Sequence, residues 1–301
     1  MLDLDHLPKS LLIIGGGVIG VEMAAVWAKL GSKVTLVEMM PHCLPTQDVE
    51  LASLLQDVRR EDGVEILCGS KVSKIEDTTG GKLVTISCGE AENKVEVELV
   101  AISVGQKPNI EGLGLDECNV TVSNGSIETN ERMETSVPGI YAAGDVTGGM
   151  MLAYVGMAEG KVAAENTVGG KSTIDYRTVP QCIFTMPEVA SVGLTEEEAL
   201  AQGHQVRIGR FPFTASGMAM ILGERRGLVK IIAEQEYGQI LGVHIIGPRA
   251  TSLIPEAALA MKLEATPEEI IGTMHAHPTL SEAFWEAALD VSGESIHFRS
   301  R

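Results

Sequence analysis

The first residues of the chain alternate between short apolar runs and a helical pattern of apolar positions. The run LLII at residues 11–14 predicts a buried strand, and VEMAAVWAKL at residues 21–30 predicts a helix behind a glycine-rich turn. Gly31 stands where a glycine often ends a helix, and KVTLVE at residues 33–38 predicts a second strand. This order of strand, turn, helix and strand predicts a βαβ unit.

Helical spacing returns in residues 49–58, where Asp48 is suited to cap the first turn. The apolar positions of this segment fall on one helical face: Leu51, Leu54, Leu55 and Val58. Residues 64–104 then show strand patterns separated by charged or Gly-Gly turns. We therefore expect a βαβ unit followed by a strand-rich extension.

The pattern changes in the middle of the chain. Residues 104–115 are loop-like, residues 134–146 predict a strand that ends in Gly-Asp, and residues 152–170 predict an Ala-rich helix. We therefore treat residues 105–175 as a separate central segment.

Strands and helices alternate again in residues 176–301. Strand patterns occupy three segments of this region: residues 183–194, 206–213 and 228–247. The last segment turns at Tyr237-Gly238 and so predicts a pair of strands. Capping boxes precede two expected helices: Thr195 with Glu198, and Thr266 with Glu269. This region predicts an α+β domain of its own.

The composition restricts the classes of protein to which the chain can belong. Its 301 residues suffice for two compact domains, and 41 acidic against 23 basic residues give a formal net charge of −18. That charge repels phosphate, which disfavours nucleic acid and anionic membranes as partners. No apolar run approaches the about 20 residues that span a bilayer, and no signal-peptide pattern opens the chain. We expect a cytoplasmic protein, or one of an organelle matrix.

Five cysteines are spaced widely and irregularly: Cys43, Cys68, Cys88, Cys118 and Cys182. They form no CxxC or CxxxxC pair and no ligand spacing of a zinc cluster. We expect reduced cysteines in interiors or loops, and neither structural disulfides nor a metal site.

The glycine-rich turn carries the first chemical signal. In Gly15-x-Gly17-x-x-Gly20 the glycines permit a tight turn, the approach of a pyrophosphate and close helix packing. Glycines also serve plain turns, but Glu38 ends the next strand, where a carboxylate can accept the adenosine ribose hydroxyls. No arginine follows in residues 39–41 to pair with a 2′-phosphate, so we expect NAD rather than NADP. The cofactor-binding residues expected here are Gly15, Gly16, Gly17, Val18, Ile19, Gly20, Val21 and Glu38.

Two further segments carry polar residues next to helix starts. Residues 135–166 read as a strand, a loop and a helix start, in which Asp145 is a helix cap or a turn aspartate. Near the end of the chain, His277 lies just before an expected helix, and Glu282 lies five residues after His277. Such a carboxylate fixes the imidazole tautomer and raises its basicity, as a general base requires. Thr279 with Glu282 is equally a capping box, which leaves a structural role open.

Together these motifs give the chain a resemblance to a known enzyme family. IIGGGVIGVEMA (residues 13–24), VPQCIFTMPEVASVGLTEEEA (residues 179–199) and HPTLSE (residues 277–282) are similar to segments of the dihydrolipoamide dehydrogenases. These are flavin-disulfide enzymes among the class I pyridine nucleotide-disulfide oxidoreductases. The resemblance covers essentially residues 1–301 and includes VGQKPN at residues 104–109.

The resemblance implies a fold and a set of cofactor contacts. The expected fold class is α/β, with a Rossmann-like NAD-binding domain (residues 1–104), the second part of an FAD domain (residues 105–175) and a C-terminal α+β dimerisation domain (residues 176–301). In the family, the aspartate at the position of Asp145 binds the ribityl chain, and the next helix start meets the flavin ring. The family usually has histidine at the position of Tyr154. Further cofactor contacts implied by the resemblance are Glu22 (beside the nicotinamide), Val72, Gly105, Asp145, Met151, Leu152, Ala153 and Tyr154.

The resemblance also implies a reaction, in which dihydrolipoamide is oxidised with FAD as relay and NAD⁺ as acceptor. The implied catalytic residues are His277, which takes a thiol proton, and Glu282, which orients it. The implied assembly is a homodimer in which the histidine serves the other subunit's site. The implied partner carries dihydrolipoamide on a lipoyl domain of a 2-oxo acid dehydrogenase or glycine-cleavage complex.

Two motifs of the family have no counterpart in this sequence: the first FAD-binding glycine turn and the CxxxxC disulfide. We therefore expect the chain alone to lack dehydrogenase activity and to hold FAD weakly or not at all. Two alternatives stay open at this point. One is a non-catalytic NAD-binding and dimerisation module, and the other is a different NADH-dependent flavin-disulfide reductase.

Overall fold

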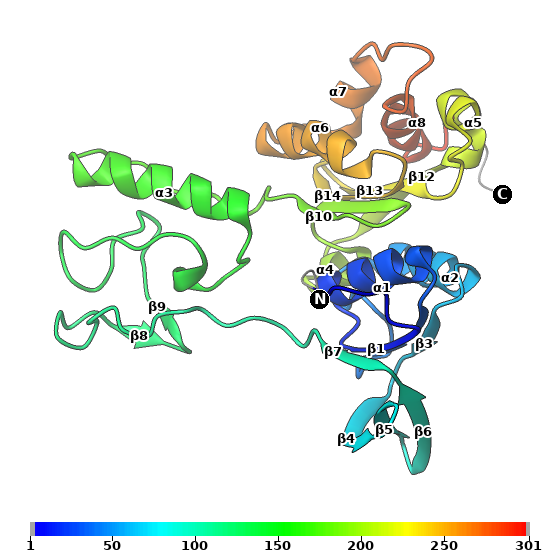
Figure 1. Ribbon diagram of the computed structural model, residues 1–301. Coiled ribbons are helices and arrows are strands. Elements are labelled where there is room, and N and C mark those ends of the chain that lie inside the picture. The colour runs from blue at the N-terminus through cyan, green and yellow to red at the C-terminus, as the bar shows by residue number, and fades with distance from the viewer. Residues whose placement is uncertain (1–3, 299–301) are drawn as a thin grey trace. The chain divides into compact units, whose positions relative to one another are not determined.

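The computed structural model describes residues 4–298, which form two compact units (Figure 1). The first unit joins the chain up to Val104 with the chain from Pro180 onward, and the second unit is Gly105–Val179. The presence of a parallel sheet, antiparallel sheets and packed helices confirms the expected α/β class. Among the helices described, none is both long and apolar enough to cross a membrane.

A four-stranded parallel sheet, in the order β3-β2-β1-β7, organises the first part of the chain. Its elements and their helices are β1 (Ser10–Ile14), α1 (Val18–Leu30), β2 (Lys33–Val37), α2 (Val49–Glu61), β3 (Glu65–Leu67) and β7 (Leu99–Ile102). Ile14 pairs with both Val37 and Ile102, so three strands end level with one another. The loops after these strands therefore meet at one edge, where Rossmann-like folds bind their ligands.

The expected helices are present, with small changes at their ends. α1 starts at Val18 rather than at residue 21, and Gly31 ends it in the left-handed conformation. Asp48 caps α2 by accepting a hydrogen bond from a backbone N–H of the first turn. The predicted apolar face of α2 holds two buried residues, Leu51 and Leu55, and two half-buried ones, Leu54 and Val58.

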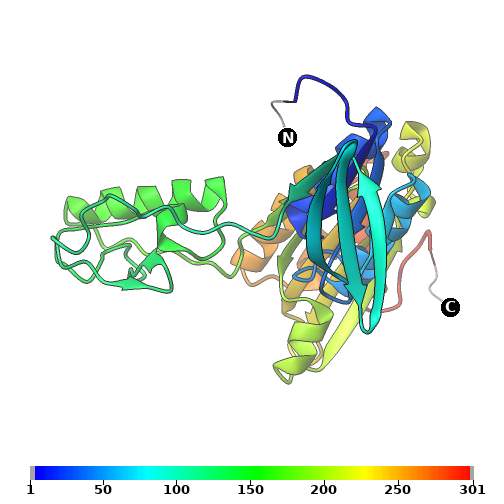
Figure 2. The ribbon, with the colours of Figure 1, turned by 60° about the horizontal axis from the view of Figure 1, so that its bottom comes forward.

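The strand-rich stretch predicted for residues 64–104 is confirmed. Besides β3 and β7 it forms an antiparallel sheet of β4 (Lys71–Thr78), β5 (Gly81–Cys88) and β6 (Ala91–Val97), which lie side by side in Figure 2. Val84 of β5 packs with Leu12 and Val37 of the parallel sheet. This contact fixes the antiparallel sheet to the βαβ unit.

The last part of the chain is built on a five-stranded antiparallel sheet in the order β10-β11-β14-β13-β12. Its strands are β10 (Gln181–Ile183), β11 (Glu188–Gly193), β12 (Val206–Pro212), β13 (Leu228–Glu234) and β14 (Ile240–Gly247). Its helices are α4 (Glu196–Ala201), the 3-10 turn η2 (Phe213–Ala215), α5 (Gly217–Leu222), α6 (Ala250–Lys262), α7 (Pro267–Gly272) and α8 (Glu282–Asp290). The turn predicted at Tyr237-Gly238 lies between β13 and β14, and both capping boxes, at Thr195 and Thr266, are formed.

β14 is buried along its whole length because both faces of its sheet are covered. On one face, Val243 and Ile245 share a core with residues of α6 and α8. On the other face, Ile246 joins the core of the parallel sheet, together with Ile183 and Val189. This shared core makes the two regions one compact unit.

A buried ion pair crosses between the same two regions. Asp48 at the start of α2 accepts a hydrogen bond from Nζ of Lys230 in β13 at 2.8 Å, and both side chains are 2% exposed or less. Glu50 and Glu196 also approach Lys230, at 3.2 and 2.8 Å. Three carboxylates therefore surround one buried ammonium group.

The second unit contains the hairpin β8 (Val122–Ser123) and β9 (Ser126–Ile127), the 3-10 turn η1 (Asp145–Thr147) and the helix α3 (Ala153–Thr167). The Ala-rich helix was predicted correctly, but the strand predicted at residues 134–146 is wrong. Two isolated bridges replace it: Thr129–Thr135 and Glu134–Tyr141. The chain cannot stay extended there because Gly139 and Gly144, both with a φ of 83°, turn it.

Candidate functional site

The three glycines of the first turn have separate structural reasons. Gly15 has a φ of +106°, and a Cβ there would lie 2.2 Å from the Ser103 carbonyl oxygen. A Cβ on Gly20 would lie 1.9 Å from the Gly15 carbonyl oxygen, so only glycine lets α1 close on the turn. The ideal Cβ of Gly17 meets nothing within 4 Å. Packing therefore requires the first and third glycines, whereas the second leaves room for a ligand.

The start of α1 presents backbone N–H groups without a side-chain cap. Its N-cap, Gly17, makes no side-chain hydrogen bond, and its first turn contains no acidic residue. Val18 and Ile19 are 37% and 46% exposed although they are apolar, whereas Val21 is buried. A helix start attracts the negative charge of a phosphate, and the exposed apolar side chains offer a surface to the rest of a ligand. These residues fit a bound dinucleotide.

Glu38 lies beneath the glycine turn and is only 8% exposed. Its Oε2 accepts a hydrogen bond from the Gly16 N–H at 2.6 Å, and its Oε1 accepts one from the Met40 N–H at 2.7 Å. Each carboxylate oxygen can accept a further hydrogen bond, because it has two lone pairs. The structure thus brings Glu38 together with the turn and fixes its carboxylate there.

Three other residues predicted to contact NAD or FAD lie outside the glycine turn: Glu22, Val72 and Gly105. Glu22 of α1 is half-buried, and its Oε1 accepts a hydrogen bond from the Phe184 N–H at 2.8 Å. Val72 of β4 packs at the margin of the core between the two sheets. Gly105 is the first residue of the second unit and has a φ of +116°. Of these residues, only Glu22 lies on the helix that the glycine turn opens.

The second unit brings together the residues predicted to contact the flavin. Asp145 is exposed and begins η1, and Leu152 is the N-cap of α3 without a side-chain capping bond. Met151 has a φ of +45°, and the exposed residues Ala153 and Tyr154 begin the helix. An exposed carboxylate and an open helix start on one unit fit the proposed contact with a ribityl chain and a flavin ring.

Sequence reasoning missed the residue that holds this arrangement, Glu159 of α3. It is 3% exposed, its Oε2 accepts a hydrogen bond from the Gly144 N–H at 2.7 Å, and its Oε1 accepts one from the Tyr176 hydroxyl at 2.7 Å. Burial and this carboxylate raise the pKa of the Tyr176 hydroxyl. Gly156 permits close packing, since a Cβ there would lie 3.1 Å from Gly144 Cα. The sequence contained one signal for Glu159, namely an acidic residue inside an Ala-rich helix.

His277 and Glu282 are brought together near the end of the described chain. The Nδ1 atom of His277 lies 2.8 Å from Glu282 Oε1, and Glu282 Oε2 accepts a hydrogen bond from the Thr279 N–H at 2.8 Å. An ionised carboxylate can only accept, so Nδ1 carries the proton and Nε2 carries the lone pair. The His277 side chain is 76% exposed, so its ring is open to a substrate.

The capping box predicted for the same segment is only half formed. α8 starts at Glu282, and its N-cap is Ser281 rather than Thr279. The Thr279 hydroxyl donates to the Ala276 carbonyl at 2.6 Å instead of capping the helix. The Glu282 carboxylate therefore serves the backbone of Thr279 and the imidazole of His277 at the same time.

Neighbouring contacts hold α8 in place. Trp285 Nε1 donates to the Ile271 carbonyl at 3.0 Å, and the buried Glu286 carboxylate accepts a hydrogen bond from the Ser295 hydroxyl at 2.7 Å. His275 is engaged at both ring nitrogens, by the Thr273 carbonyl and by Glu256. His277 rather than His275 is therefore the histidine with an open ring nitrogen.

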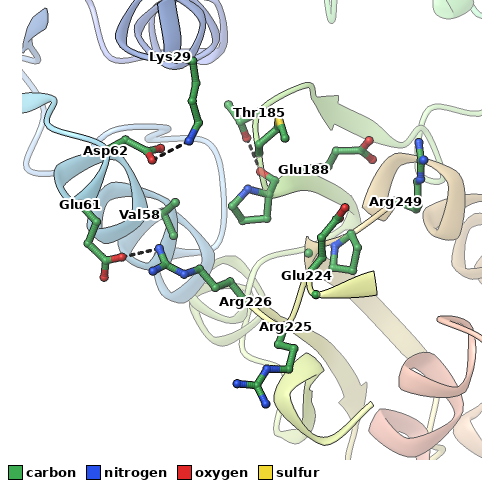
Figure 3. A pocket seen from close by; sticks show the side chains of 15 residues that line it. Lys29, Val58, Glu61, Asp62, Thr185, Glu188, Glu224, Arg225, Arg226 and Arg249 are labelled. Carbon is green, nitrogen blue, oxygen red and sulfur yellow. Dashed lines mark hydrogen bonds and ion pairs between the residues drawn. The ribbon is translucent and has the colours of Figure 1, made fainter. Parts of the chain in front are cut away.

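A cavity of about 630 Å³ lies elsewhere in the first unit (Figure 3). Two ion pairs border it, one between Lys29 and Asp62 and one between Arg226 and Glu61. Its charged lining contains equal numbers of each sign: Lys29, Arg225, Arg226 and Arg249 against Glu61, Asp62, Glu188 and Glu224. Among the described residues, no side chain predicted for a cofactor or for catalysis lines it. The cavity is therefore distinct from the candidate site.

The parallel sheet, its open glycine turn and the attached five-stranded sheet define a Rossmann-like nucleotide-binding protein with a second α+β domain. The chain belongs to the pyridine nucleotide-disulphide oxidoreductases. The model of that family matches residues 1–160, and the model of its dimerisation domain matches residues 179–288. This confirms the family inferred from the glycine turn and HPTLSE. Proteins of this family use FAD and NAD.

Individual relatives extend the comparison. A dihydrolipoyl dehydrogenase of Bacillus subtilis is 44% identical over 300 residues, which cover 99% of this chain and 63% of the relative. The mitochondrial dihydrolipoyl dehydrogenase of Pisum sativum is 42% identical over 98% of this chain and 60% of the relative. The chain thus spans less than two thirds of the length of these relatives.

Two solved structures are also similar. The crystal structure of LpdA from Mycobacterium tuberculosis has a TM-score of 0.88 and 33% identity, and the match covers 96% of this chain and 62% of that one. The HOCl-induced flavoprotein disulfide reductase RclA from Escherichia coli has a TM-score of 0.86 and 27% identity, over 97% of this chain and 66% of that one.

Proposed function

We propose that this chain supplies the NAD-binding part, a segment of the FAD-binding part and the acid–base histidine of a dihydrolipoyl dehydrogenase. The observation that carries the proposal is the His277–Glu282 hydrogen bond, which leaves Nε2 as the exposed basic atom. The Bacillus subtilis relative, 44% identical over 99% of the chain, supports it. Because the chain spans only 63% of that relative, the reaction itself, dihydrolipoamide and NAD⁺ to lipoamide and NADH, is part of the proposal.

His277 acts on a thiol of the substrate. Its Nε2 takes the thiol proton and leaves a thiolate, which is the nucleophilic form of sulfur. The imidazolium that results keeps its other proton on Nδ1, where Glu282 Oε1 offsets the charge. Because the Thr279 N–H holds the second carboxylate oxygen, Glu282 stays in position through this change.

When bound, NAD⁺ supplies the hydride acceptor and FAD supplies the relay of electrons from the thiols. We assign the NAD contacts to the glycine turn and the start of α1, with Glu38 as acceptor for the adenosine ribose hydroxyls. Glu38 is fixed by two backbone N–H groups, so it cannot swing away from a 2′-phosphate, and the two negative charges would repel. Glu22, Val72 and Gly105 are assigned to the same cofactors on the resemblance alone.

The assignment of FAD contacts rests on the second unit. Asp145 is proposed to bind the ribityl chain, and the backbone of Met151, Leu152 and Ala153 is proposed to meet the flavin ring with Tyr154 beside it. The open start of α3 and the exposure of Asp145 support this assignment.

The proposed assembly is a homodimer in which His277 serves the site of the other subunit. The match of the dimerisation domain to residues 179–288 supports a dimer. Met274, three residues before the histidine, is 99% exposed, which suits a segment that a second chain covers. The proposed partner is dihydrolipoamide on a lipoyl domain of a 2-oxo acid dehydrogenase or glycine-cleavage complex, and the proposed location is the cytoplasm.

The NAD part of the proposal is tested by titrating the 301-residue chain with NADH and NADPH. We expect NADH to bind at least about tenfold more tightly, a difference of about 1.4 kcal/mol. Glu38→Ala should narrow this preference by relieving the repulsion of the 2′-phosphate. Equal affinities of the unaltered chain for both cofactors would remove the role given to Glu38.

The catalytic part is tested in a fusion in which this chain replaces the 300 matching residues of the Bacillus subtilis relative. We expect a flavin-containing protein that reduces NAD⁺ with dihydrolipoamide. A fusion that binds flavin and passes electrons from NADH to an artificial acceptor, but does not oxidise dihydrolipoamide, would contradict the proposal. It would instead favour a different flavin-disulfide reductase, an alternative to which the similarity with RclA gives some weight.

A further inference from the structure

Two cysteines that are far apart in the sequence meet beside the glycine turn. Cys43 lies in the loop after β2, and Cys68 directly follows β3. Their Sγ atoms are 4.0 Å apart. Backbone hydrogen bonds join the two segments, from the Glu38 N–H to the Leu67 carbonyl and from the Gly69 N–H to the Met40 carbonyl, both at 2.9 Å. The pairing of adjacent parallel strands therefore places the two thiols together.

The two thiols share one polar neighbour and differ in burial. Gln56 Oε1 accepts a hydrogen bond from the Cys68 thiol at 3.2 Å and another from the Cys43 N–H at 3.1 Å. Both cysteines are free, Cys43 is 1% exposed, and Cys68 is only half-buried. A disulfide bond is about 2.05 Å long, so the sulfurs need to approach by about 2 Å.

The position of Cys43 is coupled to the nucleotide-binding turn. A Cβ built on Gly16 would lie 2.9 Å from Cys43 Sγ and 3.0 Å from Glu38 Cβ, so the sulfur, the turn and the carboxylate pack against one another. The Leu44 N–H also donates to the Gly16 carbonyl at 2.9 Å. A movement of Cys43 toward Cys68 therefore changes the packing beneath Gly16 and beside Glu38.

We propose that Cys43 and Cys68 form a disulfide when the protein meets a peroxide, and that this bond weakens dinucleotide binding. In the first step Cys68 Sγ, the more accessible sulfur, attacks a peroxide oxygen; hydrogen peroxide gives a sulfenic acid and one water. In the second step Cys43 Sγ attacks the Cys68 sulfur, the S–S bond forms, and the hydroxyl leaves with the Cys43 proton as a second water. The two thiols lose two electrons in total, and the peroxide gains them.

The order of the two steps follows from the environment of the buried thiol. Burial raises the pKa of the Cys43 thiol, and the neighbouring Cys68 and Glu38 side chains act in the same direction. Cys43 therefore stays protonated and out of reach of external oxidants, and it reacts only after Cys68 has been oxidised beside it.

The proposal rests on NAD binding as proposed above, and its test separates the two. The 301-residue chain is treated with hydrogen peroxide, and its proteolytic peptides are compared by mass before and after reduction with dithiothreitol. We expect a linked pair of peptides containing Cys43 and Cys68, lighter by two hydrogens, and the loss of two of the five titratable thiols. NADH titration of the same samples should show at least about tenfold weaker binding after oxidation, restored by dithiothreitol.

Two variants control the experiment. Cys68→Ser retains a hydroxyl that can donate to Gln56, and it should bind NADH as the reduced chain does while losing all sensitivity to peroxide. Cys88→Ser removes an exposed thiol elsewhere and should stay as sensitive as the unaltered chain. Unlinked peptides, or linked peptides with unchanged NADH affinity, would overturn the proposal. If the reduced chain bound no NADH, the proposed function would fail, and the peptide masses would still decide whether the disulfide forms.

Discussion

The Asp48–Lys230 pair and the His277–Glu282 pair share a nitrogen–oxygen distance of 2.8 Å and lie in opposite surroundings. The first pair is almost fully buried between two sheets, whereas the histidine of the second is 76% exposed. Separating a buried pair leaves an uncompensated charge in the interior, but separating an exposed pair costs little because water replaces the lost contact. Burial, not distance, therefore distinguishes the pair that holds the fold from the pair that can act on a substrate.

The largest expected effect concerns the exposed pair and its chemistry. In the fusion with the Bacillus subtilis relative, His277→Ala should lower dihydrolipoamide oxidation by about 10²–10⁴-fold, because a positioned general base contributes that much. Transfer from NADH to an artificial acceptor should be spared, since that half of the reaction needs no thiol deprotonation. Steady-state rates for both assays test this, and equal losses in both would mean that His277 is structural.

The buried pair should dominate stability instead. Lys230→Met leaves Asp48 without its ammonium partner and should lower the free energy of unfolding by about 3–5 kcal/mol. His277→Ala should change it by no more than about 1 kcal/mol, because the exposed pair contributes little. Urea unfolding of the 301-residue chain measures both variants side by side. A similar loss of unfolding free energy in both variants would contradict the view that the buried pair stabilises the fold more than the exposed pair does.

The free energy of unfolding should fall at low pH, because protonation of Asp48 removes the charge that pairs with Lys230. Burial raises the pKa of Asp48, but the hydrogen bond from Lys230, the electrostatic interactions with His244 and Lys230 and a hydrogen bond from the Glu50 backbone together outweigh it, so the folded pKa lies below the ordinary value. The stabilisation is therefore complete above the unfolded pKa of about 3.9, and it is lost as the pH falls through the folded pKa. Asp48→Asn should flatten this acid limb of the unfolding curve. An acid limb of unchanged steepness in that variant would contradict the assignment.

The smallest effect is expected at the orienting carboxylate. Glu282→Gln keeps the side chain's size but weakens its charge-assisted hydrogen bond to His277, and it should lower dihydrolipoamide oxidation by about tenfold. It should spare NADH oxidation by an artificial acceptor, as His277→Ala does. A loss larger than that of His277→Ala would show that the Thr279 contact of Glu282, rather than its contact with the imidazole, controls the site.

Local spacing allowed much of the candidate site to be predicted. The glycine turn lies within six residues, and His277 and Glu282 are five residues apart, so the order of elements alone brings their members together. Glu38 was predictable for the same reason, since it directly follows the strand after the helix. The helices and strands around these motifs followed from apolar periodicity, which reports the buried face of each element.

Contacts between distant segments were not predictable from spacing. Asp48 and Lys230 are 182 positions apart, and only the packing of two sheets on one core makes them neighbours. Wide spacing also hid the approach of Cys43 and Cys68, although adjacent strands carry them. The strand predicted at residues 134–146 was wrong because the apolar pattern took no account of Gly139 and Gly144, which turn the chain.

The doubly covered strand β14 has a consequence for the exchange of its amide hydrogens with solvent. Because helices cover one face of its sheet and the parallel sheet covers the other, we expect the amide hydrogens of β14 to exchange with solvent only when the whole first unit opens. We therefore expect the two sheets of the first unit to unfold together as one cooperative block.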